Sequence, residues 1–397
     1  MVPSGWKLEF VENIFNVQLG KMLNKAAKEQ FPQFQYLGNT NVKWGYFELS
    51  DLKSMFFNER EREKFTLLNG DILMCEGGEV GRCAIWNIGQ KEIFFQKALH
   101  RLRSKGSIIP EYFQNYMIFI AGTKLLDDST TRTSIAHLTR EKLLKLPIKV
   151  PPLHEQQKIA QILSTWDKAI STTESLITNS QQQKKSLMQQ LLTGKKRFVG
   201  FKEKWEITKL SQVAIIIMGS SPKSANYNET GIGLPLIQGN ADIKYRKSCP
   251  RIFTSQITKE CFIGDILLSV RAPVGTVAIS KHNACIGRGI SSIKAKNGYS
   301  HEFLYQWLLY FEPKWERLSQ GSTFEAVNSH DIKSLHINIP SSQNEQQKIA
   351  SILTTADQEI ETLQQKLSHL KQEKKALMQQ LLTGKRRVIV DKETEAA

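Results

Sequence analysis

The chain has 397 residues, of which 40% are hydrophobic and 23% are charged. This composition is that of a globular protein and excludes a disordered or fibrous chain, while the length favours two or more domains. The 54 Lys and Arg residues against 38 Asp and Glu give a net charge of +16, which fits a polyanionic partner and a merely basic surface equally well. No apolar run reaches the ~18 residues of a membrane span and the first residues show no secretory signal, so we expect a cytoplasmic protein.

The first region, residues 1–150, has a mixed α/β pattern, with a short helix predicted at 112–120. Gly70-Asp71-Ile72-Leu73 is followed by a glycine-rich stretch at 76–81. That stretch lacks the Lys-Ser/Thr and the helix opening of a phosphate-binding loop. It therefore predicts a turn between two strands.

The second region, residues 151–197, predicts one long helix. Pro151 and Pro152 precede it and Gly194 follows its last apolar residue, as helix boundaries require. Seam positions recur every three to four residues, which is typical of a coiled coil. They are Ile159, Leu163, Trp166, Ile170, Ile177, Leu187 and Leu191.

The third region, residues 198–340, is again mixed α/β. Strands are predicted at 214–217, 265–270 and 277–279, and a helix at 303–311. A second long helix is predicted at 341–387, followed by a C-terminal tail at 388–397. Its seam consists of Ile349, Leu353, Ile360, Leu363, Leu367, Leu370, Leu377 and Leu381.

The two helical regions are copies of one another. Residues 155–197 return at 345–387 with a constant offset of 190, and 25 of the 43 positions are identical. Lys184 and Lys374 occupy the same seam position, where a polar residue can help to set the register. The simplest arrangement pairs the two helices within one chain, although a homodimeric coil from each helix remains an alternative.

The sequence shows no catalytic or metal-binding constellation. The 5 cysteines have no CxxC spacing and the 8 histidines form no metal-binding pair, so we predict reduced thiols and no metal site. Nucleotide-binding, nucleophile-elbow and paired-acid motifs are also missing. We therefore predict a non-catalytic protein that binds no cofactor itself.

Basic, aromatic and amide side chains gather instead in the predicted loops. Such groups can neutralise phosphates and contact base edges in DNA, although each one alone is equally at home on a solvated surface. The candidate DNA-binding residues are Asn41, Lys43, Trp44, Arg82, Lys97, Arg132, Lys223, Tyr227, Asn240, Arg246, Arg271 and Arg288. Arg103, Lys244 and Lys247 belong to the wider set.

Two strings carry a family resemblance. PPLHEQQKIAQIL with MQQLLTGKKRF, and PSSQNEQQKIASIL with MQQLLTGKRRV, are similar to the repeats of type I restriction–modification specificity subunits. The resemblance implies an α+β protein with a pseudo-two-fold repeat. Two mixed α/β target-recognition domains, residues 1–150 and 198–340, would be joined by an antiparallel coiled coil of the spacer helices 151–197 and 341–387.

The same resemblance implies the partners. Each target-recognition domain would read half of a split site in double-stranded DNA, and two methyltransferase subunits and the restriction subunits would assemble on this chain. S-adenosylmethionine and ATP would be cofactors of those partners. A self-sufficient methyltransferase or nuclease would need the missing motifs, and a purely structural coiled coil would leave the charge and the long variable regions unexplained.

Overall fold

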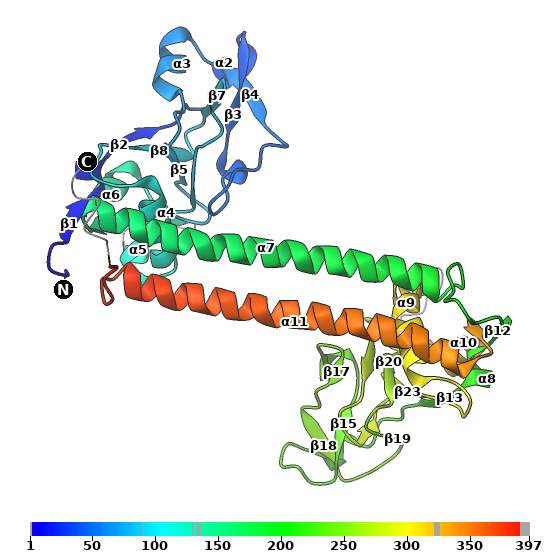
Figure 1. Cartoon of the computed structure of the whole chain (residues 1–397). Helices are drawn as coiled ribbons and strands as arrows, with labels where there is room; N and C mark the ends of the chain where they lie inside the picture. Colours follow the sequence, from blue (N-terminus) through cyan, green and yellow to red (C-terminus); the bar gives the residue numbers. More distant parts are fainter. Residues whose placement is uncertain (1, 90, 129–130, 133–135, 321–325, 390–397) are drawn as a thin grey trace. The chain divides into compact units, whose positions relative to one another are not determined.

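The computed structural model describes the chain except residues 1, 90, 129–130, 133–135, 321–325 and 390–397 (Figure 1). Most of the expected tail, 388–397, thus lies outside the described residues. The chain divides into two compact units. The first unit comprises residues 1–173 and 366–397 and the second comprises residues 174–365, so each unit contains part of both long helices.

The first unit is built, within its described residues, around the sheets β2-β8-β5-β6 and β4-β3-β7 and the pairs β1-β11 and β9-β10. Strand β5 (Ile72–Cys75) is buried along its length because it lies between two cores. Ile72 and Met74 enter one core and Leu73 and Cys75 the other, as the two-residue period of a strand dictates. The other elements are β1 (Lys7–Phe10), α1 (Val11–Ile14), β2 (Phe15–Leu19), α2 (Lys25–Glu29), β3 (Gln33–Leu37), η1 (Asn39–Asn41), β4 (Lys53–Phe56), α3 (Glu59–Phe65), β6 (Cys83–Ile85), β7 (Ile93–Phe95), β8 (Leu99–Ser104), α4 (Pro110–Ile120), α5 (Lys124–Asp128), β9 (Thr131–Arg132), β10 (Ala136–His137), α6 (Arg140–Leu144) and β11 (Pro147–Val150).

The second unit repeats this plan in its described part, with the sheets β13-β23-β20-β21-β17-β16 and β14-β18-β15-β22-β19 and the pair β12-β24. Strand β20 (Ile266–Ser269) corresponds to β5: Ile266 and Leu268 enter one core and Leu267 the other. The other elements are β12 (Trp205–Lys209), α8 (Leu210–Val213), β13 (Ala214–Met218), η2 (Ser224–Asn226), β14 (Tyr227–Asn228), β15 (Leu234–Ile237), η3 (Asn240–Asp242), β16 (Ile243–Lys244), β17 (Lys247–Ser248), β18 (Ile252–Thr254), β19 (Glu260–Cys261), β21 (Val277–Ile279), β22 (Ala284–Ile286), β23 (Ile290–Ala295), α9 (His301–Gln320), α10 (Ser329–Ser334) and β24 (His336–Pro340).

The local predictions in both units are confirmed. The expected strands at 214–217, 265–270 and 277–279 correspond to β13, β20 and β21. The expected helices at 112–120 and 303–311 lie inside α4 and α9. The glycine-rich stretch 76–81 joins β5 to β6 as a turn, as predicted.

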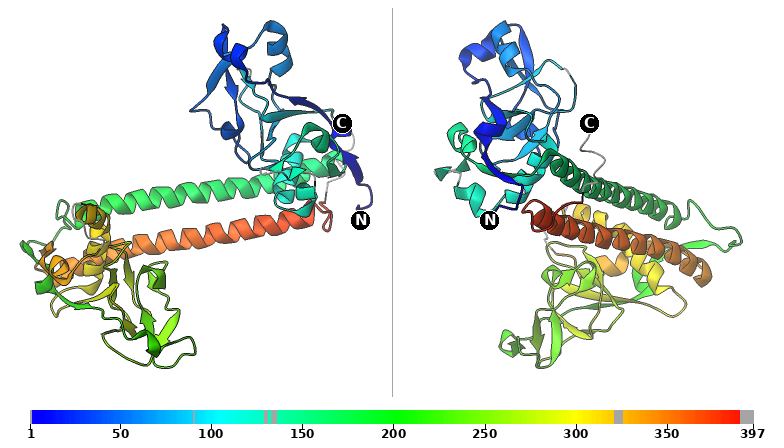
Figure 2. Two further views of the ribbon diagram at one scale, coloured as in Figure 1. Left: turned by 180° about the vertical axis from the view of Figure 1, so that it is seen from behind. Right: turned by 60° about the vertical axis from the view of Figure 1, so that its left-hand side comes forward.

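The two long helices, α7 (Leu153–Leu191) and α11 (Gln343–Leu381), are packed together in one chain (Figure 2). Of the expected seam residues, Ile159, Leu163, Ile177, Leu191, Ile349, Leu353 and Leu381 are buried. Trp166, Ile170, Leu187, Ile360, Leu363, Leu367, Leu370 and Leu377 are half-buried. The ends of both helices therefore belong to the domain cores, and the middle is a narrower apolar seam.

Two equivalent ion pairs fix the antiparallel register. In the second unit Lys184 Nζ lies 2.5 Å from Asp357 Oδ1, and in the first unit Lys374 Nζ lies 2.5 Å from Asp167 Oδ1. The two pairs are related by the offset of 190. Because each lysine ammonium in the seam needs this one carboxylate, a slipped register would leave it without its partner.

A buried glutamine joins the beginning of each helix to its domain. Gln346 accepts a hydrogen bond from Ser300 N at 2.7 Å and donates to Pro340 O at 2.8 Å. In the other unit Gln156 accepts from Ile109 N at 2.8 Å and donates to Pro151 O at 2.8 Å. Both glutamines are fully buried, so each satisfies backbone groups that water cannot reach.

Gln346→Ala should therefore destabilise the protein. The substitution leaves the N–H of Ser300 and the C=O of Pro340 buried without their partner, at a cost of about 3 kcal/mol in the free energy of unfolding. The control is Gln347→Ala at the adjacent exposed glutamine, which should change that free energy by less than about 0.5 kcal/mol. Urea unfolding of both variants measures the difference, and equal effects would refute this role of Gln346.

Candidate nucleic-acid interface

One pair of cations, Lys97 and Arg288, occupies corresponding loops in the two units. Gly20 N donates to Leu99 O at 3.0 Å, and Gly219 N donates to Ile290 O at 2.9 Å. Lys97 and Arg288 each stand two residues before these acceptors, and both are exposed. The loops therefore present a cation at the same place in each unit.

Glycine is required where these loops cross. A Cβ on Gly20 would lie 2.2 Å from Gln96 O, and one on Gly219 would lie 2.2 Å from Gly287 O. Such distances are far below any real carbon–oxygen contact, so a larger residue would push the cation-bearing loop away. No sequence motif singles out these two glycines, because the close approach that requires them joins segments more than 60 residues apart.

A hairpin follows the short helices η1 and η3 in the two units. In the first, Val42 pairs with Phe47; in the second, Ile243 pairs with Ser248. Lys43 and Lys244 thus correspond, as do the aromatic residues that follow them, Trp44 and Tyr245. Lys43 is half-buried and Lys244 is exposed.

Three of the first unit's candidates serve mainly to hold loops together. Asn41 is buried: its Oδ1 accepts from Gly38 N at 2.9 Å, and its amide donates to Glu48 O at 3.0 Å and Asp51 O at 3.1 Å. Arg82 donates to Asn39 O at 2.9 Å. Trp44 Nε1 donates to Glu79 Oε1 at 2.6 Å.

The carboxylate at the centre of this loop contact is held in its charged form. The hydrogen bond from Trp44 and the adjacent Arg82 guanidinium, 3.0 Å away, lower the pKa of Glu79 below its ordinary value. Trp44 and Arg82 therefore lie on either side of one anion, so neither is a free group waiting for a ligand. Arg132 lies in β9, and its side chain is outside the described residues.

The second unit brings three of its candidates together. Arg288 N donates to Ser221 Oγ at 3.1 Å, and Gln238 lies against Gly287, so the loops that carry Lys223, Asn240 and Arg288 adjoin. Lys223 is exposed and Asn240 is half-buried.

The remaining second-unit candidates are Tyr227, Arg246 and Arg271, and the polar atoms of the first two already bind protein groups. Tyr227 donates its hydroxyl to Pro222 O at 3.0 Å. Arg246 Nη1 donates to Val277 O at 3.1 Å and to Glu312 Oε2 at 2.5 Å. Arg271 is exposed beside the turn after β20. Tyr245 was not among the predicted residues; the sequence feature that marks it is an aromatic residue between Lys244 and Arg246.

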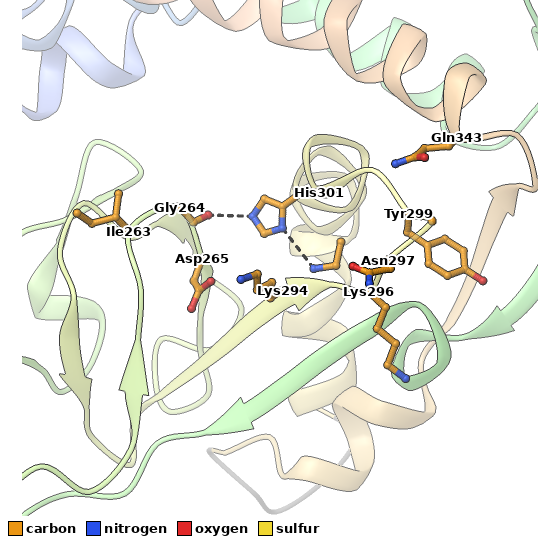
Figure 3. Close-up of a pocket in the computed structure, with 11 residues that line it drawn as sticks. Ile263, Gly264, Asp265, Lys294, Lys296, Asn297, Tyr299, His301 and Gln343 are labelled. Atoms are coloured by element: carbon orange, nitrogen blue, oxygen red, sulfur yellow. Dashed lines mark hydrogen bonds between the residues drawn. The ribbon is translucent and has the colours of Figure 1, made fainter.

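A cavity of about 390 Å³ lies at the other side of the second unit (Figure 3). Its wall includes Lys294 and His301. The His301 ring is engaged on both nitrogens, with Nε2 2.8 Å from Gly264 O and Nδ1 accepting from Ala295 N at 3.3 Å. The ring therefore fastens two strands rather than offering a ligand. Among the described residues there is no His, Cys, Asp and Glu group suited to a metal ion.

Comparison with known proteins identifies the family. The family model "Type I restriction modification DNA specificity domain" matches residues 3–179 and 202–372. The chain belongs to the type I restriction–modification specificity subunits. It is thus a non-catalytic subunit of a type I restriction enzyme.

Two related specificity subunits are similar to this chain over nearly its whole length. The sequence assigned as the MjaX specificity subunit of Methanocaldococcus jannaschii is 32% identical, with 98% of this chain and 95% of that protein covered. The MjaVIII specificity subunit of the same organism is 24% identical over 98% of this chain and 94% of its own length.

Solved structures share the fold of the specificity subunit. A chain from a study of complex assembly and conformational transition in a type I restriction–modification system has a TM-score of 0.65 at 24% identity, covering 97% of this chain and 100% of that one. The S subunit from M. genitalium has a TM-score of 0.63 at 15% identity, covering 98% of this chain and 97% of that one.

No helix in the described part of the chain is long and apolar enough to cross a membrane.

Asn41→Ala tests whether the buried amide is structural. Its loss leaves Gly38 N without its acceptor and the carbonyls of Glu48 and Asp51 without their donor, so we expect a loss of about 2 kcal/mol in the free energy of unfolding. Lys97→Ala, at an exposed cation, is the control and should change it by less than about 0.5 kcal/mol. Thermal unfolding followed by circular dichroism compares the two. Equal stability of Asn41→Ala and the parent would contradict the structural role.

Proposed function

We propose that this specificity subunit reads a bipartite site in double-stranded DNA. The regions 1–150 and 198–340 serve as its target-recognition domains, and the regions 151–197 and 341–387 as spacer helices that set the distance between the half-sites. The observation that carries the proposal is the recurrence of exposed cations at one loop position, Lys97 and Arg288, in a chain with a net charge of +16. Exposed cations at the same place in both units can each neutralise a phosphate of the DNA backbone, which carries phosphates at regular intervals.

We assign the candidate DNA-binding residues to different roles according to how exposed they are and whether their polar atoms already bind protein groups. Lys97, Lys223, Arg271 and Arg288 are exposed and contact DNA directly. Lys43 and Asn240 are half-buried at the edges of the same loops and can add contacts. Asn41, Trp44, Arg82, Tyr227 and Arg246 shape the loops, because their polar atoms already bind protein groups.

The symmetry of the helix ends supports two copies of a partner. Arg197 Nε lies 2.9 Å from Glu345 Oε1, and Arg387 Nε lies 2.9 Å from Glu155 Oε2, again at an offset of 190. Two equivalent surfaces bind two equivalent subunits. We propose that these are methyltransferase subunits, which bind S-adenosylmethionine. Restriction subunits, which use ATP, then join the complex. The complex works in the cytoplasm.

The decisive experiment is methylome sequencing of cells with and without this chain. A split motif that loses its methylation when the chain is deleted supports the function, and an unchanged methylome overturns it. The purified chain alone should transfer no methyl group from S-adenosylmethionine to DNA, because catalysis resides in the partner.

Changing the length of the helices should change only the spacer. Each helix has 39 residues and is therefore about 58 Å long. This length corresponds to about 17 base pairs of DNA. Since the domains overhang the helices, we expect the centres of the half-sites to lie about one DNA turn apart. Inserting one heptad after Ser175 and one after Gln365, which face each other in the observed register, keeps the seam and adds about 10 Å, or about three base pairs.

Selection from a random DNA library reports both half-sites and spacer for this double insertion. We expect a longer spacer and the same half-site bases. Substitutions in the loop 220–231 are the matched counterpart and should alter one half-site and leave the spacer unchanged. Insertions that change the bases would contradict the role of the helices.

The salt dependence of DNA binding should show whether Lys97 and Arg288 contact phosphates. In the assembled complex Lys97→Ala and Arg288→Ala should each reduce the slope of log affinity against log salt by about one, because one counterion fewer is released. Lys168→Ala, at an exposed position on α7, is the control and should leave the slope unchanged. Anisotropy titrations between about 50 and 200 mM salt measure it. Parent-like slopes for both loop variants would remove these residues from the interface.

A further inference from the structure

The hairpin of β16 and β17 carries an uncovered aromatic ring at its tip. Tyr245 is 95% exposed, and Tyr245 and Arg246 have φ angles of 49° and 61°. Two central residues with positive φ make a type I′ turn, which Asn and Gly adopt with least strain. The turn therefore holds two residues in a strained backbone conformation, a feature that is retained where the position of a side chain matters.

The residues after Tyr245 fasten the hairpin on both sides. Arg246 binds Glu312 of α9, as described above, and its carbonyl oxygen accepts from Ile279 N at 2.9 Å. Lys247 Nζ lies 3.1 Å from Glu361 Oε1 of α11. Tyr245 thus projects from an anchored turn and not from a free loop.

The ion pair between Lys247 and Glu361 holds the hairpin beside the middle of α11 (Figure 1). Leu353 lies in the core of the second unit, and Glu361 is eight residues further along, about 12 Å. If the helices separate the half-sites, as we propose above, this side of the domain faces the spacer.

The corresponding hairpin of the first unit has a different tip. Trp44 stands at the position of Tyr245, but it is half-buried and bound to Glu79. Gly45, with φ of 82°, replaces the strained Arg246. An aromatic residue therefore occupies this position at both tips, and of these two rings Tyr245 is the uncovered one. In the first hairpin the neighbouring Tyr46 is 60% exposed.

Resting on the proposed DNA-binding function, we propose that Tyr245 inserts its ring into a base step at the spacer side of the half-site read by the second unit and stacks there on the partly unstacked base. Lys244, exposed beside it, neutralises an adjacent phosphate. An exposed aromatic ring beside an exposed cation suits duplex DNA, whose base steps admit an inserted side chain and whose phosphates are anionic. An apolar protein partner would need a wider apolar patch, whereas the neighbours here are Lys244, Arg246 and Lys247.

The test replaces the ring without straining the fold. Tyr245→Asn fits a type I′ turn better than tyrosine, so its unfolding midpoint should equal or exceed that of the parent. Its complex should bind a duplex containing the site found by methylome sequencing about tenfold more weakly. Tyr245→Phe keeps the ring and should stay within about twofold of the parent.

A fluorescent base locates the contact. With 2-aminopurine placed at successive spacer positions beside the second half-site, binding of the parent and of Tyr245→Phe should change the fluorescence at one position, and binding of Tyr245→Asn should not. Parent-like affinity of Tyr245→Asn, or the same fluorescence change with it, overturns the stacking role and leaves the proposed function standing. A parent complex without preference for the site would overturn both.

Discussion

The arrangement depends on the burial of two carboxylates at the beginnings of the long helices. The side chains of Glu155 and Glu345 are only 5% and 0% exposed. A buried carboxylate is strongly unfavourable unless a cation meets it, and here the cations are Arg387 and Arg197, each just beyond the end of the other helix. This requirement brings the end of one helix to the beginning of the other, which is an antiparallel pair.

The tryptophans reinforce the same two sites. Trp6 Nε1 lies 3.2 Å from Glu155 Oε2, and Trp205 Nε1 lies 3.4 Å from Glu345 Oε1. Trp6 directly precedes β1 of the pair β1-β11, and Trp205 is the first residue of β12 in the pair β12-β24. In each unit one carboxylate, Glu155 or Glu345, therefore binds both this strand pair and the arginine beyond the helix end. The ion pairs of Lys184 and Lys374 then fix the register between the ends, where apolar residues alone would tolerate a shift by one heptad.

Duplication preserved the framework of the loops and altered their side chains. The glycine crossings and the loop cations recur, because the first are imposed by backbone contact and the second share one position. The hairpin tips differ: Trp44 is tied to Glu79, while Tyr245 is free and strained. Two domains with the same framework can therefore present different side chains at corresponding loops.

The sequence by itself determined the helices, their seam, their ends and the repeat. These features are local: apolar spacing, proline and glycine boundaries and an offset of 190 can be read without knowing any distant contact. The buried strand β20 was equally visible as a short apolar run, and the turn predicted at 76–81 implied the strand before it, β5.

Only the tertiary structure decided which loop residues are free. Arg82 and Asn39 are 43 residues apart, and Arg246 and Glu312 are 66 residues apart, so no local pattern pairs them. Asn41 and Tyr245 are both polar residues in turns, yet one is buried among backbone partners and the other is almost fully exposed. A polar side chain is available to a ligand only when the fold has left its hydrogen-bonding groups unused, and that depends on neighbours which the folded chain brings together.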